Sequence, residues 1–332
     1  MTTTRRQGAR RGPGGGPGGR AGGPLLRSGR VVDAGYEATE DRIVRVYVHG
    51  GVSGRTRPVR DLTYAVAAGR ESSSALSAVE AAITRLEDDP ELNAGYGAVL
   101  NANGDLELDA GIADGSTGAL GAVAAVAVRN PISLARAVLE HTPHVLMAGE
   151  GAGRLARELG LDPLEDTTAS QRARWLESLT QESLGGTGFG APEQVDTVGA
   201  VVLDERGRLC AGSSTGGVAG QLPGRVGDSP VFGAGFYASK GAAVTGTGVG
   251  ELFVETLASL RAGRLIETGA DPQEACEAII ELLGRRRGDA AAGLLALDGD
   301  GRVGAAFRGA SWSVAGPEGV VDAVRMEYLS QS

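Results

Sequence analysis

The stretch "TVGAVVLDERGRLCAGSST" (197–215) consists of two short runs of apolar and small residues separated by a polar turn. Such runs favour buried strands, and a glycine near the middle suits a tight antiparallel connection. The stretch therefore predicts a β-hairpin turning at residues 205–207. A second hairpin of the same kind is expected over "AAGLLALDGDGRVGAAFR" (291–308), turning at residues 298–301.

Segments with helical spacing separate the predicted strands. Serines able to cap a helix precede the periodic apolar residues of 72–89, and Asp271 and Pro272 have the types preferred at a helix N-cap and first position. The helix in 130–159 is expected to be interrupted near Pro143 and at 149–153. The expected helices are 72–89, two within 130–159, 250–269 and 271–288.

Further strands are expected before and between these helices. Residues 42–51 alternate enough to form a strand, 121–128 form an all-apolar run, and Asn103-Gly104 within 97–112 signals a hairpin. Each half of the chain then has strands, two helices and strands again. This order predicts an α+β fold of four layers, α-β-β-α, with two sheets packed face to face between helices.

Charge is unevenly distributed along the 332 residues, whose net charge is −9. Residues 1–30 hold seven arginines and no acidic residue, so the remainder has 25 basic and 41 acidic residues, about −16. A body this acidic is a poor candidate for nucleic-acid binding. The Arg/Gly-rich tail over 1–40 is expected to be disordered, with one folded domain over 41–332.

Cysteine usage and hydropathy give two further expectations. Cys210 and Cys276 fall in segments typical of a buried strand and a buried helix, which favours core packing over a disulfide or a metal pair. No apolar stretch approaches the roughly 18 residues of a membrane-spanning helix. The pair Arg5–Arg6 lacks the apolar region of a secretion signal, so a cytoplasmic protein without a membrane span is expected.

Several familiar chemistries find no support. The glycine-rich pieces "GEGAGR" (149–154) and "GTGVGE" (246–251) do not have the spacing of nucleotide-binding loops. His49, His141 and His144 lack metal-binding spacing, and no G-x-S-x-G nucleophile elbow is present. Histidine-ligated metal sites, nucleotide sites and Ser-His-Asp hydrolase sites are therefore not predicted.

Thr197, directly after Asp196, has two interpretations. A threonine at the start of a strand is common, because its branched Cβ suits a pleated surface. A threonine can also act as a nucleophile if its own α-amino group, with a pKa of about 7.7–8.0, serves as the base. That chemistry requires cleavage of the Asp196–Thr197 bond, and the polar stretch 166–196 would be a flexible linker ending at that bond.

From about Ile43 onward, the sequence resembles the threonine-dependent N-terminal-nucleophile hydrolases that comprise plant-type L-asparaginases, isoaspartyl peptidases, aspartylglucosaminidases and taspase. In order and spacing, the similar pieces are highly specific. They are "HGG" (49–51), "LNAGYGAVLNANGDLELDAGIADG" (92–115), "GAVAAVAVRNPISLARAVLEHTPHVLMAGEGA" (121–152), "DTVGAVVLDERGRLCAGSSTGG" (196–217), "GRVGDSPVFGAG" (224–235) and "TGVGE" (247–251).

The resemblance implies a role for individual residues. Thr197 matches the nucleophile that autocatalytic cleavage after Asp196 releases, and Thr215 matches the threonine that assists its activation. Thr247, Gly248 and Asn93 match the groups that stabilise the oxyanion, a term often worth ~10²–10³ in rate for one donor. Arg225 and Asp228 match the residues that hold the α-carboxylate and α-amino group of the substrate, with Gly248 beside them. His49 and Gly50–Gly51 match an element that contacts the nucleophile region.

The implied enzyme is an autoprocessed amidohydrolase acting on L-asparagine, on β-aspartyl (isoaspartyl) dipeptides or on both. An aspartylglucosaminidase-like or taspase-like hydrolase remains an alternative, as does a catalytically silent binding protein with the same fold. The family's assembly implies a dimer of αβ units. No cofactor is required, although backbone carbonyls of "RLEDDPE" (85–91) are expected to hold a structural sodium ion.

Three pieces depart from the patterns typical of this family. Val249 in "TGVGE" stands where related sequences often have Thr or His. The loop "HGGVSG" (49–54) replaces the more usual "HGGAG", and "FRGASWS" (307–313) does not match the corresponding piece of asparaginases. These departures leave the identity of the substrate open.

Overall fold

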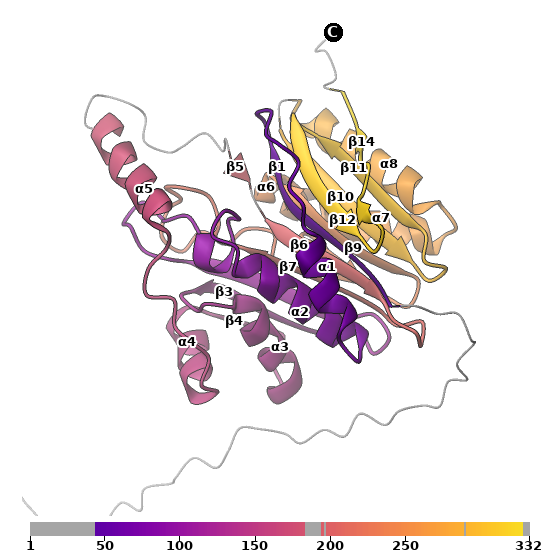
Figure 1. The fold of residues 1–332 in the computed structure, drawn as a ribbon, viewed down its shortest axis with the longest axis horizontal. Helices are drawn as coiled ribbons and strands as arrows, with labels where there is room; N and C mark the ends of the chain where they lie inside the picture. The colour runs from indigo at the N-terminus through magenta and orange to yellow at the C-terminus, as the bar shows by residue number, and fades with distance from the viewer. Residues whose placement is uncertain (1–43, 183–193, 196, 289, 328–332) are drawn as a thin grey trace, which may run out of the picture.

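The computed structural model describes residues 44–182, 194–195, 197–288 and 290–327, and in these residues it contains two β-sheets and eight α-helices (Figure 1). The 1–40 tail and Asp196 lie outside the described residues. The helices are α1 (Thr63–Arg70), α2 (Ala75–Glu87), α3 (Pro131–His141), α4 (Gly149–Glu158), α5 (Ala169–Glu182), α6 (Gly250–Thr256), α7 (Ala258–Glu267) and α8 (Pro272–Arg286).

The larger sheet has the order β13-β12-β1-β6-β7-β2-β3-β4, with β5 also paired to β1. Apart from the parallel pair β3–β4, its neighbouring strands are antiparallel. Its strands are β1 (Arg45–Ser53), β2 (Leu108–Asp114), β3 (Ala119–Val126), β4 (Leu146–Ala148), β5 (Gln194–Val195), β6 (Val198–Leu203), β7 (Leu209–Thr215), β12 (Ser311–Gly316) and β13 (Gly319–Val320).

The smaller sheet has the order β14-β11-β10-β9-β8. Strands β9, β10 and β11 form its antiparallel centre. Its strands are β8 (Phe236–Ala238), β9 (Ala242–Gly248), β10 (Ala292–Asp298), β11 (Val303–Arg308) and β14 (Val324–Arg325). Strands β6 and β7 contact β9 and β8, so the two sheets face each other.

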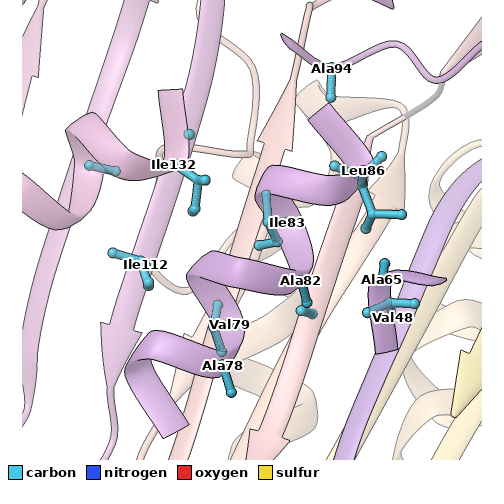
Figure 2. Close-up of a cluster of buried hydrophobic side chains, with 14 of the residues drawn as sticks. Val48, Ala65, Ala78, Val79, Ala82, Ile83, Leu86, Ala94, Ile112 and Ile132 are labelled. Carbon is cyan, nitrogen blue, oxygen red and sulfur yellow. The ribbon is translucent and has the colours of Figure 1, made fainter. Parts of the chain in front are cut away.

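Each sheet also carries helices. Helices α2 and α3 contact β6, β7, β2 and β3 of the larger sheet, whereas α7 and α8 contact β9, β10 and β11 of the smaller one. Figure 2 shows Ile83 and Leu86 of α2 in the cluster that also holds Val48 of β1 and Ile112 of β2. A separate cluster, which includes Phe236 and Trp312, fills the space between the sheets. Apolar burial therefore fixes the sheets relative to each other and to their helices.

The principal hairpins and helix starts are confirmed. β6–β7 and β10–β11 are antiparallel hairpins, and their turns contain Gly207 at φ +74° and Gly301 at φ +82°, a conformation that favours glycine. Ser74 caps α2 by accepting the N–H of Ser77. At α8, Asp271 accepts the N–H of Gln273. Local capping and turn chemistry thus determine these boundaries.

Other expectations need correction. Asn103-Gly104 forms a turn, but the Asn101 side chain closes it by accepting the N–H groups of Asn103 and Asp105, and no strand precedes it there in the described residues. The segment 250–269 is two helices, because Leu257 adopts the left-handed conformation at φ +50°. Strand β4 was not expected, and helix α5 occupies part of the polar stretch 166–196.

Both cysteines are buried and free, Cys210 in β7 and Cys276 in α8, as core packing predicts. Burial raises the pKa of both thiols. No helix in the described part of the chain is long and apolar enough to cross a membrane.

Candidate functional site

Thr197 and Thr215 lie opposite each other at one end of the larger sheet. Strands β6 and β7 pair with Val198 opposite Ser214, and the next pair outward in this antiparallel register is Thr197 and Thr215. Both threonines are buried, with 2% and 4% of their surface exposed. The hairpin that the sequence predicts therefore brings together the two threonines that flank it.

Thr197 lies on the face of the larger sheet that is turned toward the smaller sheet. A Cβ built on Gly199 would meet Thr245 of β9, so this face of β6 turns toward the smaller sheet. Thr197 stands two residues before Gly199, and Thr247 two residues after Thr245, so both share these facing surfaces. Thr247 is fully buried. The fold thus directs Thr197 and Thr247 toward the same intersheet space.

Gly248 ends β9 in a conformation that favours glycine, with φ +150°. A Cβ at this position would lie 2.7 Å from the carbonyl oxygen of Ala291, so a larger residue would displace the backbone just before β10. Close backbone packing therefore fixes the end of β9 beside Thr247.

Asn93 fastens the turn that follows Thr215. Its side-chain amide donates to the carbonyl of Gly217 at 2.7 Å, and its side-chain oxygen accepts the N–H of Val99 at 2.9 Å. Its own carbonyl accepts the N–H of Gly216 at 2.8 Å. Asn93 is 3% exposed. It therefore binds the two residues that follow Thr215, and the second N–H of its amide has no acceptor among the described residues.

His49 is fully buried between the sheets. Its Nε2 atom is 3.2 Å from the Thr245 hydroxyl and its Nδ1 atom 3.0 Å from the Gly50 carbonyl. Burial lowers its pKa to about 4, although the carbonyls of Gly50 and Thr197 act in the opposite direction. The ring is thus neutral at neutral pH and contacts the Thr197 backbone, in agreement with the supporting role that the resemblance implies.

Arg225 and Asp228 lie in the loop between β7 and β8. Arg225 binds Glu251 in the first turn of α6, with its Nε atom 3.0 Å from the carboxylate. Asp228 is buried, and its Oδ2 atom has no hydrogen-bond partner in the described residues. The burial of Asp228 thus distinguishes it from a carboxylate in an ordinary surface ion pair. A buried carboxylate oxygen without a donor favours an external cationic partner.

The Asp228 carboxyl has a raised pKa of about 7. Burial is the main cause, and the negative charges of Asp109 and Glu251 add to it, while Arg225 opposes it. Gly250 makes room for both binding groups, because a Cβ there would lie 2.8 Å from Asp228 Oδ1 and 3.0 Å from Arg225 Nη2. A cation arriving beside Asp228 would favour its ionised form.

Asp109 is a site residue that sequence reasoning missed. It is 1% exposed on β2 and pairs in register with Thr215 of β7. Its carboxylate accepts the N–H of Ala125 at 2.9 Å and of Gly227 at 3.0 Å. The acidic residue directly before the small and apolar residues of "LELDAGI" (106–112) was the available signal. Asp109 links the strand beside Thr215 to the loop of Arg225 and Asp228.

Glu87 was missed as well. This buried carboxyl at the end of α2 accepts the hydroxyl of Ser214 at 2.6 Å and the N–H of Ile132 at 3.0 Å. Burial raises its pKa to about 8. Ser214 is the residue before Thr215. Its hydrogen bond to Glu87 therefore holds β7 against α2 next to this threonine.

The remaining polar motifs form no second site. His141 and His144 lie at the end of α3 and just beyond it, and "GEGAGR" forms the start of α4. Among the described residues, no group of three or more His, Cys, Asp or Glu side chains could hold a metal ion.

Comparison with known proteins agrees with this arrangement. The asparaginase family profile matches residues 43–321. The chain is 46% identical to a plant-type L-asparaginase of Pyrobaculum calidifontis over 69% of its own length and 78% of the relative. It is 39% identical to an isoaspartyl peptidase of Salmonella typhimurium, over 82% and 95% of the two chains. A mouse isoaspartyl peptidase/L-asparaginase is 40% identical over 74% and 79%.

The family match covers both sheets up to β13. It includes Thr197, Thr215 and Thr247, the Asn93 loop and the Arg225–Asp228 loop. On this extent of similarity, the chain belongs to the asparaginase family.

Proposed function

We propose that the protein is an autoprocessed amidohydrolase of the four-layer N-terminal-nucleophile type that hydrolyses L-asparagine and β-aspartyl dipeptides. The observation that carries this proposal is the position of Thr197 opposite Thr215, with the buried, unpartnered Asp228 oxygen held nearby through Asp109. The names of the relatives, L-asparaginase and isoaspartyl peptidase, support the same reaction.

Maturation requires cleavage of the bond between Asp196 and Thr197. The Thr197 hydroxyl attacks the Asp196 carbonyl carbon, and the acyl group moves from nitrogen to oxygen as an ester. Water then hydrolyses the ester and leaves a free α-amine on Thr197. This divides the chain into an α fragment ending at 196 and a β fragment of 197–332.

In turnover, the Thr197 hydroxyl oxygen attacks the side-chain amide carbon of the substrate. The new α-amine of Thr197 takes the proton from the hydroxyl in this step. Thr247, Gly248 and Asn93 stabilise the oxyanion, and Thr215 assists activation. The leaving amine takes the proton, and water then releases aspartate from the Thr197 ester. The amide bond is thus exchanged for the Thr197 ester, and water then hydrolyses this ester, so the reaction needs no cofactor.

Substrate selection uses the amino-acid end. The Arg225 guanidinium pairs with the α-carboxylate, for which its present partner Glu251 stands in, and Asp228 pairs with the α-ammonium. An ammonium provides the cationic partner that the Asp228 oxygen lacks within the described residues. Asparagine and β-aspartyl dipeptides present the same end and differ only in the leaving amine.

The alternatives have weaker support. An aspartylglucosaminidase would typically carry disulfides, whereas Cys210 and Cys276 are free and buried. A taspase-like enzyme would be expected to lack the threonine found at 215. A silent binding protein would not need Thr197, Thr215 and Thr247 on facing surfaces.

A sodium ion and a dimer of αβ units complete the proposal. The carbonyl oxygens of Asp89, Pro90 and Leu92 lie close together, because all three are within 3.1 Å of the point that a Gly97 Cβ would occupy. Carbonyl oxygens are ligands that a hard cation prefers, and a cation bound by this loop would stabilise the segment before Asn93. Exposed Leu257 and Leu265 would contribute to contact between copies. Cytoplasmic location stays a prediction from the sequence.

Mass spectrometry and a paired assay test the function. Wild-type protein should give two fragments dividing before Thr197 and release ammonia from asparagine and amino acid from β-aspartyl dipeptides. Thr197→Ala should stay intact and inactive, whereas Thr268→Ala, at an exposed helix end, should behave as wild type. An intact wild-type chain with full activity, or equal product release by Thr197→Ala, would overturn the proposal.

A further inference from the structure

A polar cavity of about 640 Å³ lies against the strand that contains His49. Its lining includes Gly50 and Gly51 of β1 and Trp312 of β12. Trp312 donates its indole N–H to the Gly50 carbonyl at 2.9 Å, and its ring lies 5.6 Å from the His49 ring. Trp312 thus lines the cavity and also packs near the His49 ring, which contacts the Thr197 backbone.

Two of the three segments that depart from the usual family pattern line this cavity, and both contribute strand residues. "HGGVSG" contributes Gly50, Gly51 and Ser53, and "FRGASWS" contributes Ser311, Trp312 and Ser313. Hydrogen bonds join the segments, since Ser311 Oγ accepts the N–H of Arg57 at 3.2 Å and Ser313 Oγ that of Arg60 at 2.8 Å. Sequence features specific to this chain therefore shape one cavity.

The strand order gives the cavity a defined position relative to the substrate. Strand β6 lies between β1 and β7. Strand β1 pairs with β6 up to His49 and Gly199 and then with β5 from Val52 and Val195, so residues 50–51 of β1 lie beside Thr197. Thr215 lies on the other side of Thr197. Arg225 and Asp228 belong to the β7 side, through Asp109. A substrate held there by its amino-acid end and attacked by Thr197 would direct its leaving group toward β1, the strand against which the cavity lies.

Positive charge dominates the cavity lining. It includes three guanidinium groups, those of Arg57, Arg60 and Arg174, and one carboxylate, that of Glu91. Arg60 is fixed by Asp89 at 2.8 Å and Glu91 at 2.6 Å. Arg57 and Arg174 also line the cavity and are exposed to solvent. Guanidinium groups are well suited to bind a carboxylate.

We propose that this cavity is a leaving-group subsite that binds the free α-carboxylate of the residue following the β-aspartyl unit. The inference rests on the proposed function and defines its substrate more closely. In a β-aspartyl dipeptide, this carboxylate is two bonds from the leaving nitrogen, whereas the ammonia released from asparagine has none. The cavity therefore selects β-aspartyl dipeptides with a free C-terminus.

The test compares β-aspartyl-leucine with β-aspartyl-leucinamide, which differ only in this carboxylate. The ratio of their kcat/KM values is the readout, so any general loss of activity cancels. We expect wild-type enzyme to prefer the free acid by at least about fivefold, and the Arg57→Gln/Arg174→Gln double variant to lose most of this preference. Arg285→Gln/Arg286→Gln, which removes the same two charges on α8, should leave the ratio unchanged. Added salt should lower the wild-type ratio.

Two results would overturn the subsite: equal kcat/KM for acid and amide in the wild type, or an undiminished preference in the double variant. Failure of the proposed function has a different signature. In that case the wild type would hydrolyse neither dipeptide nor asparagine, whereas failure of the subsite alone leaves hydrolysis intact without discrimination.

Discussion

The Asp109 carboxylate accepts the backbone N–H of Gly227 at 3.0 Å, and this bond joins β2 to the loop that carries Arg225 and Asp228. Asp109 also pairs in register with Thr215. Its second oxygen accepts the N–H of Ala125, which has the unusual φ of +50°. One buried carboxylate therefore couples the threonine pair to the loop proposed to bind the substrate head.

Replacing Asp109 with Asn should weaken substrate binding more than it slows chemistry. The amide keeps one acceptor and turns an N–H₂ group toward either Gly227 or Ala125, so one backbone donor loses its partner. We expect KM for L-asparagine to rise about tenfold, with a smaller change in kcat and with cleavage before Thr197 retained. Asp300→Asn, in an exposed turn, is the control. An unchanged KM would contradict this role.

The binding of L-aspartate, the product, should depend on pH through Asp228. With a pKa of about 7, Asp228 loses its negative charge as pH falls below 7, and with it the attraction for an ammonium. The inhibition constant of aspartate should then rise up to about tenfold per pH unit below 7. Succinate, which has no ammonium, should not follow this dependence. Parallel profiles for the two inhibitors would refute the assignment.

The same experiment on Asp109→Asn measures coupling between the two carboxyls. The Asp109 charge raises the pKa of Asp228, so its removal should move the aspartate profile to lower pH. A profile that stays in place would show that Asp109 acts only through the Gly227 hydrogen bond.

Local chemistry explains which parts of the fold were predictable. The turns at Gly207 and Gly301 and the caps Ser74 and Asp271 depend on neighbouring residues alone. The break at Leu257 depends on distant contacts, since Ser259 at the start of α7 donates its hydroxyl to the carbonyl of Ala234. Tertiary contacts of this kind override helical periodicity.

Some residues of the candidate site could likewise be predicted from the sequence, and others could not. Thr197 and Thr215 could be matched because they stand at the ends of a recognisable hairpin. Asp109 could not be assigned, because its partner Gly227 lies 118 residues away and contributes only a backbone N–H, which leaves no mark in the sequence. The partner of Glu87, Ser214, is likewise 127 residues away.

Gly250→Ala should impair substrate binding by crowding. A methyl group at this position would lie 2.8 Å from Asp228 Oδ1 and 3.0 Å from Arg225 Nη2, so at least one must move. We expect KM for L-asparagine to rise at least about tenfold while the fragments still form and fold. Gly153→Ala in α4, where the nearest atom is 3.7 Å away, is the matched control and should leave KM unchanged. Equal kinetics for both variants would contradict the crowding.

His49 should make the protein less stable in mild acid. Its pKa is about 4 in the folded protein and 6.5 for an ordinary exposed histidine, so between these limits only the unfolded chain binds the proton. Its contribution is therefore complete above pH 6.5 and decreases as pH falls, by about 3 kcal/mol at pH 4. Asp109, Asp228 and Glu87 have raised pKa values and act in the opposite direction.

The difference between wild type and His49→Gln isolates the histidine from these carboxyls. Urea unfolding from pH 7 to 4 should show the wild-type free energy of unfolding falling toward, or below, that of His49→Gln, since the variant has no ring to protonate. His144→Gln, at an exposed position, should follow the wild type. If the difference in free energy of unfolding between wild type and His49→Gln stays constant across this range, burial does not lower the pKa of His49.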